Sequence, residues 1–163
     1  MPVVQPNRRI PAIFVVSYLE KRLKSLLRTH QTLLVSLALF LVPFIVYLLT
    51  LSPGITWAHE GADGGDLITA AYTLGIPHPT GYPLYVLLGK LFSLIPLRNV
   101  AYRLNLMSAT CAAFAAVAFY FWTRAGLQHV LAGTAVRWVA ASAASASLLL
   151  AFSRLFWSQA LIA

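Results

Sequence analysis

Hydrophobic and polar positions divide the chain into long apolar runs and one polar stretch. Three runs are long and apolar enough to cross a membrane as helices, namely residues 32–51, 101–122 and 136–152. The first run has no charged residue, and twenty helical residues span about 30 Å of bilayer hydrocarbon at about 1.5 Å per residue. The pattern predicts an all-α membrane protein with about three transmembrane helices. Residues 1–31 form a basic segment, and residues 32–163 form one membrane domain.

Residues 52–100 form the predicted loop between the first two spans. Glycines 61, 64 and 65 suggest a flexible turn, after which Asp66 is expected to cap a short helix over residues 67–74. Pro83 suits the first position of a second short helix that ends near Ile95, before Pro96. That helix is too short to cross the bilayer and carries Lys90, so both helices are expected to lie at the membrane surface.

The charge pattern sets the expected orientation. The sequence is 60% hydrophobic and 10% charged, and its net charge of +8 would suit nucleic acid in a soluble protein. Half of its twelve basic residues precede the first span, however, which is the pattern of a cytoplasmic N-terminus. They are Arg8, Arg9, Lys21, Arg22, Lys24 and Arg28. The loop is then extracytoplasmic, no nucleic-acid partner is expected, and the basic segment is either a helix on membrane lipid or a solvated tail.

Three of the four acidic residues lie in the loop, at Glu60, Asp63 and Asp66. A carboxylate here can act as general base on a hydroxyl or amide, can bind a cation with its neighbours, or can simply complement a helix dipole. His59 and His78 accompany the acids, but the spacing matches no diagnostic metal-ligand pattern, so no metal ligands are assigned and metal dependence stays open.

Basic and aromatic residues surround the acids in sequence. Arg103, with Lys90 and Arg98 before it, places positive charge at the extracytoplasmic boundary, where it can bind a lipid phosphate or anchor the chain at the interface. Four aromatic residues can stack on a sugar ring or form an interfacial belt: Trp57, Tyr72, Tyr82 and Tyr85.

Three motifs resemble one branch of the GT-C glycosyltransferases, which contains the animal plexin-type protein O-mannosyltransferase and large bacterial relatives. The branch pattern Asp-x-Gly-Glu corresponds to Asp63-Gly64-Gly65-Asp66, with Asp in place of Glu. The pattern His-Pro-Pro-Gly-x-Pro-Leu corresponds to residues 78–84, with Thr80 in place of the second proline. The pattern Tyr-Arg-x-Asn corresponds fully to residues 102–105.

The resemblance implies a chemistry and assigns roles to residues. GT-C enzymes use a carboxylate of the first loop and take sugars from polyprenyl phosphates, so Asp63 becomes the catalytic base and Asp66 a second catalytic residue that orients it or the acceptor. Arg103 would neutralise the donor phosphate and His78 would shape the loop. The substrate-binding residues are then Glu60, His78, Tyr82, Arg103 and Asn105. The acceptor is an extracytoplasmic protein or glycan, and no soluble cofactor is implied.

Members of that branch are several times longer than this chain. The sequence is therefore expected to be the N-terminal part of such an enzyme, inactive alone and packed against further transmembrane helices, in a bacterial inner membrane rather than the endoplasmic reticulum. The alternative is a different class of protein: a small non-catalytic membrane subunit, or part of a transporter that binds a cation through the acidic loop.

Overall fold

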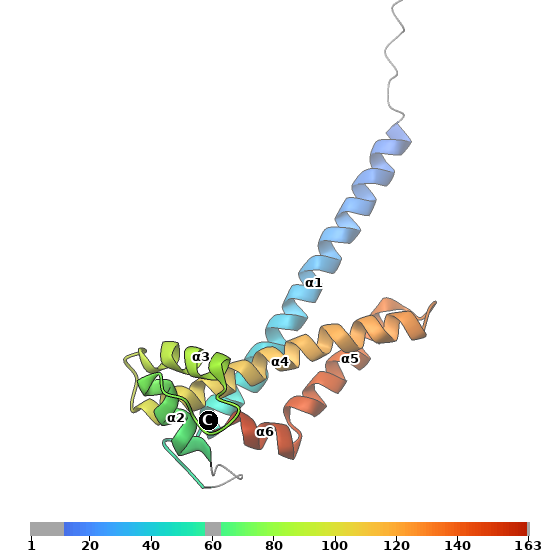
Figure 1. Cartoon of the computed structure of the whole chain (residues 1–163). Coiled ribbons are helices and arrows are strands. Elements are labelled where there is room, and N and C mark those ends of the chain that lie inside the picture. Colours follow the sequence, from blue (N-terminus) through green and yellow to red (C-terminus); the bar gives the residue numbers. More distant parts are fainter. Residues whose placement is uncertain (1–11, 58–62, 163) are drawn as a thin grey trace, which may run out of the picture. The chain divides into compact units, whose positions relative to one another are not determined.

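The computed structural model describes residues 12–57 and 63–162, with side chains from residue 18 onward. Within this part of the chain every regular element is a helix, which confirms the predicted all-α class (Figure 1). The helices are α1 (Ala12–Thr50), α2 (Gly64–Thr73), α3 (Pro83–Ser93), α4 (Val100–Val130), α5 (Val136–Ala151) and α6 (Arg154–Ala160). The chain divides into two compact units, Met1–Val35 and Ser36–Ala163.

The first unit contributes the N-terminal part of α1. Its described side chains from Tyr18 to Gln31 are exposed, and they include the basic residues Lys21, Arg22, Lys24 and Arg28. Thr29 and Thr32 each donate a hydrogen bond to the carbonyl four residues earlier, at 3.1 and 2.9 Å. The helix passes without a break from this basic segment into the apolar run.

Two helical stretches are long and apolar enough to cross a membrane, Tyr18–Thr50 and Val100–Val130. Helices α5 and α6 together make a third candidate span, bent by 63° at the break between them. Large apolar side chains stay exposed along these helices, as lipid or further helices would require: Leu34, Leu49, Phe114, Trp122 and Leu149. The prediction of about three transmembrane helices is confirmed at two or three.

Small residues allow α5 to pack closely on α4, as Figure 1 shows for these two neighbouring helices. Ala113, Ala116 and Ala143 are completely buried, and so is Ser147, whose hydroxyl donates to the carbonyl of Ala116 at 2.6 Å. The Ala- and Ser-rich composition of α5 permits this close approach. Because α5 runs back along α4, the chain returns to the end of α4 against which α2 and α3 pack.

Helices α2 and α3 pack on the N-terminal part of α4. Ile68 and Ala71 of α2 form a core with Leu104 of α4, and the half-buried Tyr85 of α3 packs against it. Pro83 begins α3 as predicted. This core fixes the start of α2, and with it Asp63 and Asp66, relative to α4.

The start of α2 differs from the expectation. Asp66 was expected to cap a helix that begins at residue 67, but the helix begins at Gly64, Asp63 occupies the N-cap position, and Asp66 lies in the first turn. Gly64 and Gly65, two of the three glycines that suggested a turn, are helical, because burial of Gly64 and Ile68 favours continuing the helix over the freedom of a loop. Gly61 lies outside the described residues.

Substitution of Gly89 by alanine should destabilise the protein. A Cβ atom there would lie 2.7 Å from the Cβ of Ala71 and 3.4 Å from a side-chain carbon of Leu104, so α3 would have to move away from α2. We expect Gly89→Ala to lower the free energy of unfolding by about 1–3 kcal/mol. Gly126→Ala is the matched control, because a Cβ atom there meets nothing within 4 Å and alanine favours a helix by up to about 1 kcal/mol. Thermal unfolding in detergent, followed by circular dichroism, measures both; equal melting temperatures would contradict the packing described.

Candidate functional site

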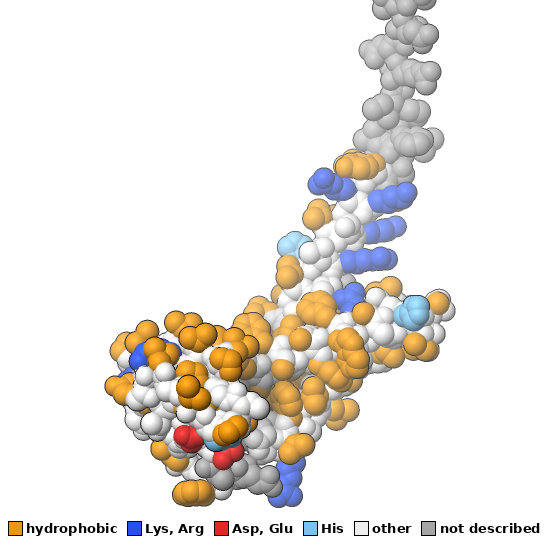
Figure 2. Space-filling view, in the orientation of Figure 1, with side chains coloured by type: hydrophobic (Ala, Val, Ile, Leu, Met, Phe, Trp, Pro, Cys, Tyr) orange, Lys and Arg blue, Asp and Glu red, His pale blue; other side chains and the backbone are white. Residues whose placement is uncertain are grey.

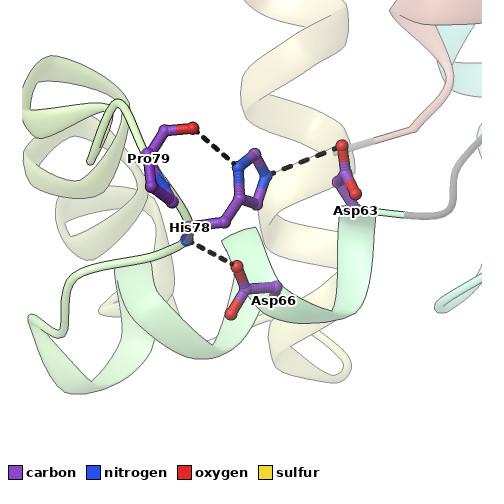
Figure 3. Close-up of polar contacts among 4 residues, drawn as sticks. All are labelled: Asp63, Asp66, His78 and Pro79. Atoms are coloured by element: carbon purple, nitrogen blue, oxygen red, sulfur yellow. Dashed lines mark hydrogen bonds and ion pairs between the residues drawn. The ribbon is translucent and has the colours of Figure 1, made fainter.

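Asp63, Asp66 and His78 come together where α2 begins (Figure 3). The backbone N–H of His78 donates to Oδ2 of Asp66 at 3.0 Å, and its ring nitrogen Nε2 lies 3.6 Å from Oδ2 of Asp63. The eleven residues between Asp66 and His78 form the rest of α2 and the turn after it, which brings the chain back to the helix start. Acidic side chains accordingly gather at one place on the surface in Figure 2.

Asp63 presents its carboxylate to the surroundings. Its side chain is 69% exposed and makes no capping hydrogen bond, although the residue occupies the N-cap position of α2. The partial positive charge of a helix N-terminus favours an ionised carboxylate there. Both loop acids of this turn therefore complement the helix dipole, but Asp63 also keeps its oxygens accessible for a substrate.

The ring of His78 is oriented by its own turn. Nδ1 lies 3.1 Å from the carbonyl oxygen of Pro79. A carbonyl only accepts, so Nδ1 carries the proton and, in the neutral ring, Nε2 faces Asp63 with a lone pair. Nε2 is buried and has no hydrogen-bond partner among the described residues. The arrangement suits a single proton located between His78 and Asp63.

Asp66 and Tyr82 hold the turn of His78 in place. Asp66 accepts the backbone N–H of His78, which fastens the turn to the first helical turn of α2. The ring of Tyr82 meets that of His78 edge-on, with centroids 5.4 Å apart. Tyr82 is the N-cap residue of α3, in a left-handed conformation with φ of 40°, and its side chain is 41% exposed. Both residues thus lie next to His78, and their roles in catalysis and substrate binding stay predictions.

Arg103 makes contacts different from those expected of a phosphate ligand. Its guanidinium donates to three backbone carbonyls, those of Leu97, Ser93 (2.7 Å) and Arg98 (3.0 Å). These carbonyls belong to the end of α3 and to the connection between α3 and α4. Arg103 therefore holds that connection closed, and a phosphate contact stays a prediction.

Asn105 likewise binds backbone. Its side chain is 1% exposed, and Nδ2 donates to the carbonyls of Ser52 (3.0 Å) and Gly54 (3.1 Å). Asn99, which the sequence analysis missed, donates to Pro53 at 3.0 Å and accepts from the N–H of Tyr102 as the N-cap of α4. An Asn before an apolar run is the available sequence signal for such a cap. Together the two asparagines fasten the segment after α1 to α4.

The remaining cation and the aromatic residues have separate partners. Lys90 donates to the carbonyl of Tyr72 at 2.6 Å and lies over its ring, so it satisfies the C-terminal end of α2. Burial raises the pKa of Tyr85 to about 12, and its hydroxyl has no partner in the described residues. Trp57 is 82% exposed. Among the ring contacts within the described part of the chain, the one between Tyr82 and His78 brings one of the four aromatic candidates for sugar stacking to the acid and histidine cluster.

Glu60 and His59 fall outside the described residues. Within residues 12–57 and 63–162, no three His, Cys, Asp or Glu side chains form a group that could hold a metal ion. The described part of the site therefore consists of two carboxylates and one imidazole.

Comparison with known proteins relates the site to a family. The family described as "Protein O-mannosyl-transferase TMEM260 N-terminal domain" matches residues 63–163, which include Asp63, Asp66 and His78. The mouse protein O-mannosyl-transferase TMEM260 is 39% identical over 131 residues, and its Dictyostelium discoideum counterpart is 36% identical over 85 residues. These alignments cover 78% and 50% of the chain but only 16% and 10% of the relatives. No solved structure matches significantly.

Proposed function

Because the chain belongs to the family of the protein O-mannosyl-transferase TMEM260 N-terminal domain, we propose that it forms the N-terminal part of a membrane glycosyltransferase. Membership confirms the resemblance to a protein O-mannosyltransferase that the three motifs indicated. The chain spans 16% of the mouse relative, so the proposed enzyme includes further transmembrane helices that complete the active site. Those helices would cover the apolar side chains left exposed on α1 and α4.

The proposed reaction transfers mannose from a polyprenyl phosphate to a hydroxyl of a protein acceptor on the extracytoplasmic side. Mannose and protein acceptor follow the names of the mouse and Dictyostelium relatives, and the donor follows the GT-C resemblance. A lipid-linked donor suits a site built on membrane helices. The lipid phosphate is the leaving group, so the reaction needs no soluble cofactor.

In the proposed mechanism Asp63 is the general base. Its carboxylate takes the proton of the acceptor hydroxyl, whose oxygen bonds to the anomeric carbon from the face opposite the phosphate. The bond between that carbon and the phosphate oxygen breaks, and its electron pair leaves with the phosphate, which inverts the anomeric configuration. The exposed carboxylate at the start of α2 is the single observation that supports this role best, because a base must reach the proton that it removes.

His78 and the other motif residues support Asp63. With Nδ1–H donated to Pro79, Nε2 of His78 can share the proton that Asp63 has taken. Asp66 positions His78 by accepting a hydrogen bond from the backbone N–H of His78. Tyr82 packs against the imidazole of His78, where the Tyr82 ring can also contact a sugar. Glu60 is proposed to bind substrate. Arg103 and Asn105 position the loop, and a direct substrate contact from either remains a proposal.

The reaction is tested with the complete protein in lipid vesicles. Polyprenyl-phosphate mannose and a nucleotide-activated mannose are offered separately with a hydroxyl-bearing protein acceptor, and the product is identified by mass spectrometry. We expect a mannosylated acceptor from the lipid-linked donor alone. Transfer from the nucleotide sugar without a lipid intermediate would contradict the proposal.

The proposed orientation predicts which side of the membrane the site faces. A cysteine at residue 65 is suitable for labelling, because a Cβ atom there meets nothing within 4 Å, once the exposed Cys111 has been changed to alanine. In intact cells or right-side-out vesicles we expect Gly65→Cys to react with a membrane-impermeant thiol reagent. Ser25→Cys, in the basic segment, should react only after the membrane is opened. The reverse pattern would place the acids in the cytoplasm.

A further inference from the structure

Of the lysine and arginine side chains in residues 63–162, one has no hydrogen bond, ion pair or ring contact. Lys90 and Arg103 donate to backbone carbonyls, and the guanidinium of Arg98 lies 4.7 Å from the ring centroid of Tyr102. Arg154 is exposed and has no hydrogen bond, ion pair or ring contact within the described part of the chain. Its charge is therefore available to an anionic ligand.

Arg154 lines a groove where the chain bends by 63° between α5 and α6. The groove has a volume of about 420 Å³, within the range of about 300–1,000 Å³ typical of ligand sites. Its lining residues are Phe152, Arg154, Trp157, Ser158 and Leu161. A single cation thus accompanies a largely apolar and aromatic wall, which suits a ligand with one anionic group and a hydrocarbon chain.

The wall of the groove is held in place by α1. Nε1 of Trp157 lies 3.2 Å from the hydroxyl oxygen of Thr50, and the ring of Trp157 meets that of Phe152 edge-on with centroids 5.8 Å apart. Tyr47 donates to the carbonyl of Ala151 at 2.7 Å. The wall of the groove is therefore fixed by contacts within the second unit.

One end of the groove lies next to a small cavity at the start of α2. The N–H of Ser52 donates to the carbonyl of Leu161 at 3.3 Å. The next residue, Ile162, lines a small cavity together with Asn105 and Gly64, the first residue of α2. Leu161 and Ile162 thus separate the groove from the helix turn that follows Asp63.

We propose that this groove binds the phosphate and the first isoprenoid units of a polyprenyl phosphate, with Arg154 as the phosphate ligand. Arg binds phosphate through two parallel N–H donors, and the aromatic wall covers the hydrocarbon next to it. That the lipid carries a sugar for transfer rests on the proposed function. The assignment moves the phosphate site from Arg103, whose donors bind backbone carbonyls, to a cation that is free to bind it.

The role of the Arg154 charge is tested by measuring how four probes bind to the complete purified protein in detergent. The probes are polyprenyl monophosphate, the uncharged polyprenol, inorganic phosphate and phosphatidylglycerol. We expect Arg154→Gln to weaken polyprenyl monophosphate binding about tenfold or more, to leave polyprenol binding unchanged, and Arg154→Lys to restore part of the loss. Arg98→Gln is the matched control, an exposed arginine outside the groove, and should bind within about twofold of the parent protein.

The apolar wall is tested by filling the groove. Ser158→Phe should abolish binding of both polyprenyl monophosphate and polyprenol, whereas Leu155→Phe, at a side chain that is 77% exposed and does not line the groove, should bind both normally. Equal binding of polyprenyl monophosphate by Arg154→Gln and the parent protein would overturn the proposal. So would a loss of phosphatidylglycerol and inorganic phosphate binding in Arg154→Gln as large as the loss of polyprenyl monophosphate binding.

Measurements of lipid binding and of sugar transfer distinguish a failure of this inference from a failure of the proposed function. Arg154→Gln should raise the KM for the lipid-linked donor with little change in kcat, because Arg154 contacts the donor and not the acceptor proton. Arg154-dependent lipid binding without any sugar transfer would leave the groove assigned and refute the proposed enzyme. Asp63-dependent transfer with normal lipid binding by Arg154→Gln would support the proposed enzyme and refute the assignment of the groove.

Discussion

Replacing Asp63 with asparagine is expected to slow sugar transfer by about 10²–10⁴-fold in a complete protein that carries this segment. Asparagine keeps the shape of the side chain, but its amide cannot take a proton from an acceptor hydroxyl. The loss corresponds to about 3–5 kcal/mol of transition-state stabilisation. Donor binding should persist, so kcat falls while the dissociation constant of the polyprenyl phosphate stays near its original value. Initial rates with a lipid-linked donor, together with direct lipid binding, measure the two effects.

Three matched variants place the effect at one residue. Asp66→Asn retains an oxygen that can accept the N–H of His78, so we expect a smaller loss, and Glu60→Gln should lose least because it precedes the matched family region. His78→Gln keeps the backbone contact with Asp66 but removes Nε2, so its loss should fall between those of Asp63→Asn and Asp66→Asn. Membrane abundance must be equal for all variants. Small and equal losses at the three acids would reduce their role to complementing the helix dipole.

Replacing Arg103 with methionine is expected to destabilise the protein by about 3 kcal/mol or more, because three backbone carbonyls lose their charged donor. Methionine fills much of the same volume without donating. Arg103→Lys should recover only part of the stability, since one ammonium cannot match the geometry of a guanidinium. Thermal unfolding in detergent and membrane abundance measure the loss.

The Arg103 variants also distinguish a structural role from phosphate binding. The fraction of Arg103→Met that folds should bind polyprenyl monophosphate as the parent protein does. Normal melting with a tenfold rise in the donor KM would instead support the phosphate role predicted from the sequence. Asn105→Ala provides a comparison, because it also removes a donor to two backbone carbonyls and should lower stability in the same way.

The helices were predictable because their signals are local. Charge-free length predicted the membrane-crossing part of α1, and Pro83 predicted the start of α3. The start of α2 was not predicted, because Gly64 and Gly65 have low intrinsic helix propensity. Burial of Gly64 and Ile68 against neighbouring segments outweighs this preference, and such packing is not encoded in the local pattern.

The site was predictable in its composition but only partly in its contacts. The scarcity of acids and the branch motifs identified Asp63, Asp66 and His78, which the structure brings together. The partners of Arg103 and Asn105 were not predictable. Asn105 binds carbonyls more than 50 residues away in sequence, and the Arg103 contacts depend on how the connection between α3 and α4 folds back. Motif residues that hold backbone in place cannot be distinguished from substrate ligands by residue type alone.

The central claim, that the Asp63 carboxylate is the base for sugar transfer, is tested most directly by chemical rescue. Glycine is tolerated at an N-cap, so Asp63→Gly should fold while leaving space for a small carboxylate. The account predicts that Asp63→Gly in the complete protein transfers mannose about 10²–10⁴-fold more slowly than the parent. Added formate should raise the rate of Asp63→Gly at least about tenfold. Formate should not accelerate Asp66→Gly. Transfer by Asp63→Gly at the parent rate without formate, or rescue at Asp66→Gly instead, would contradict the account.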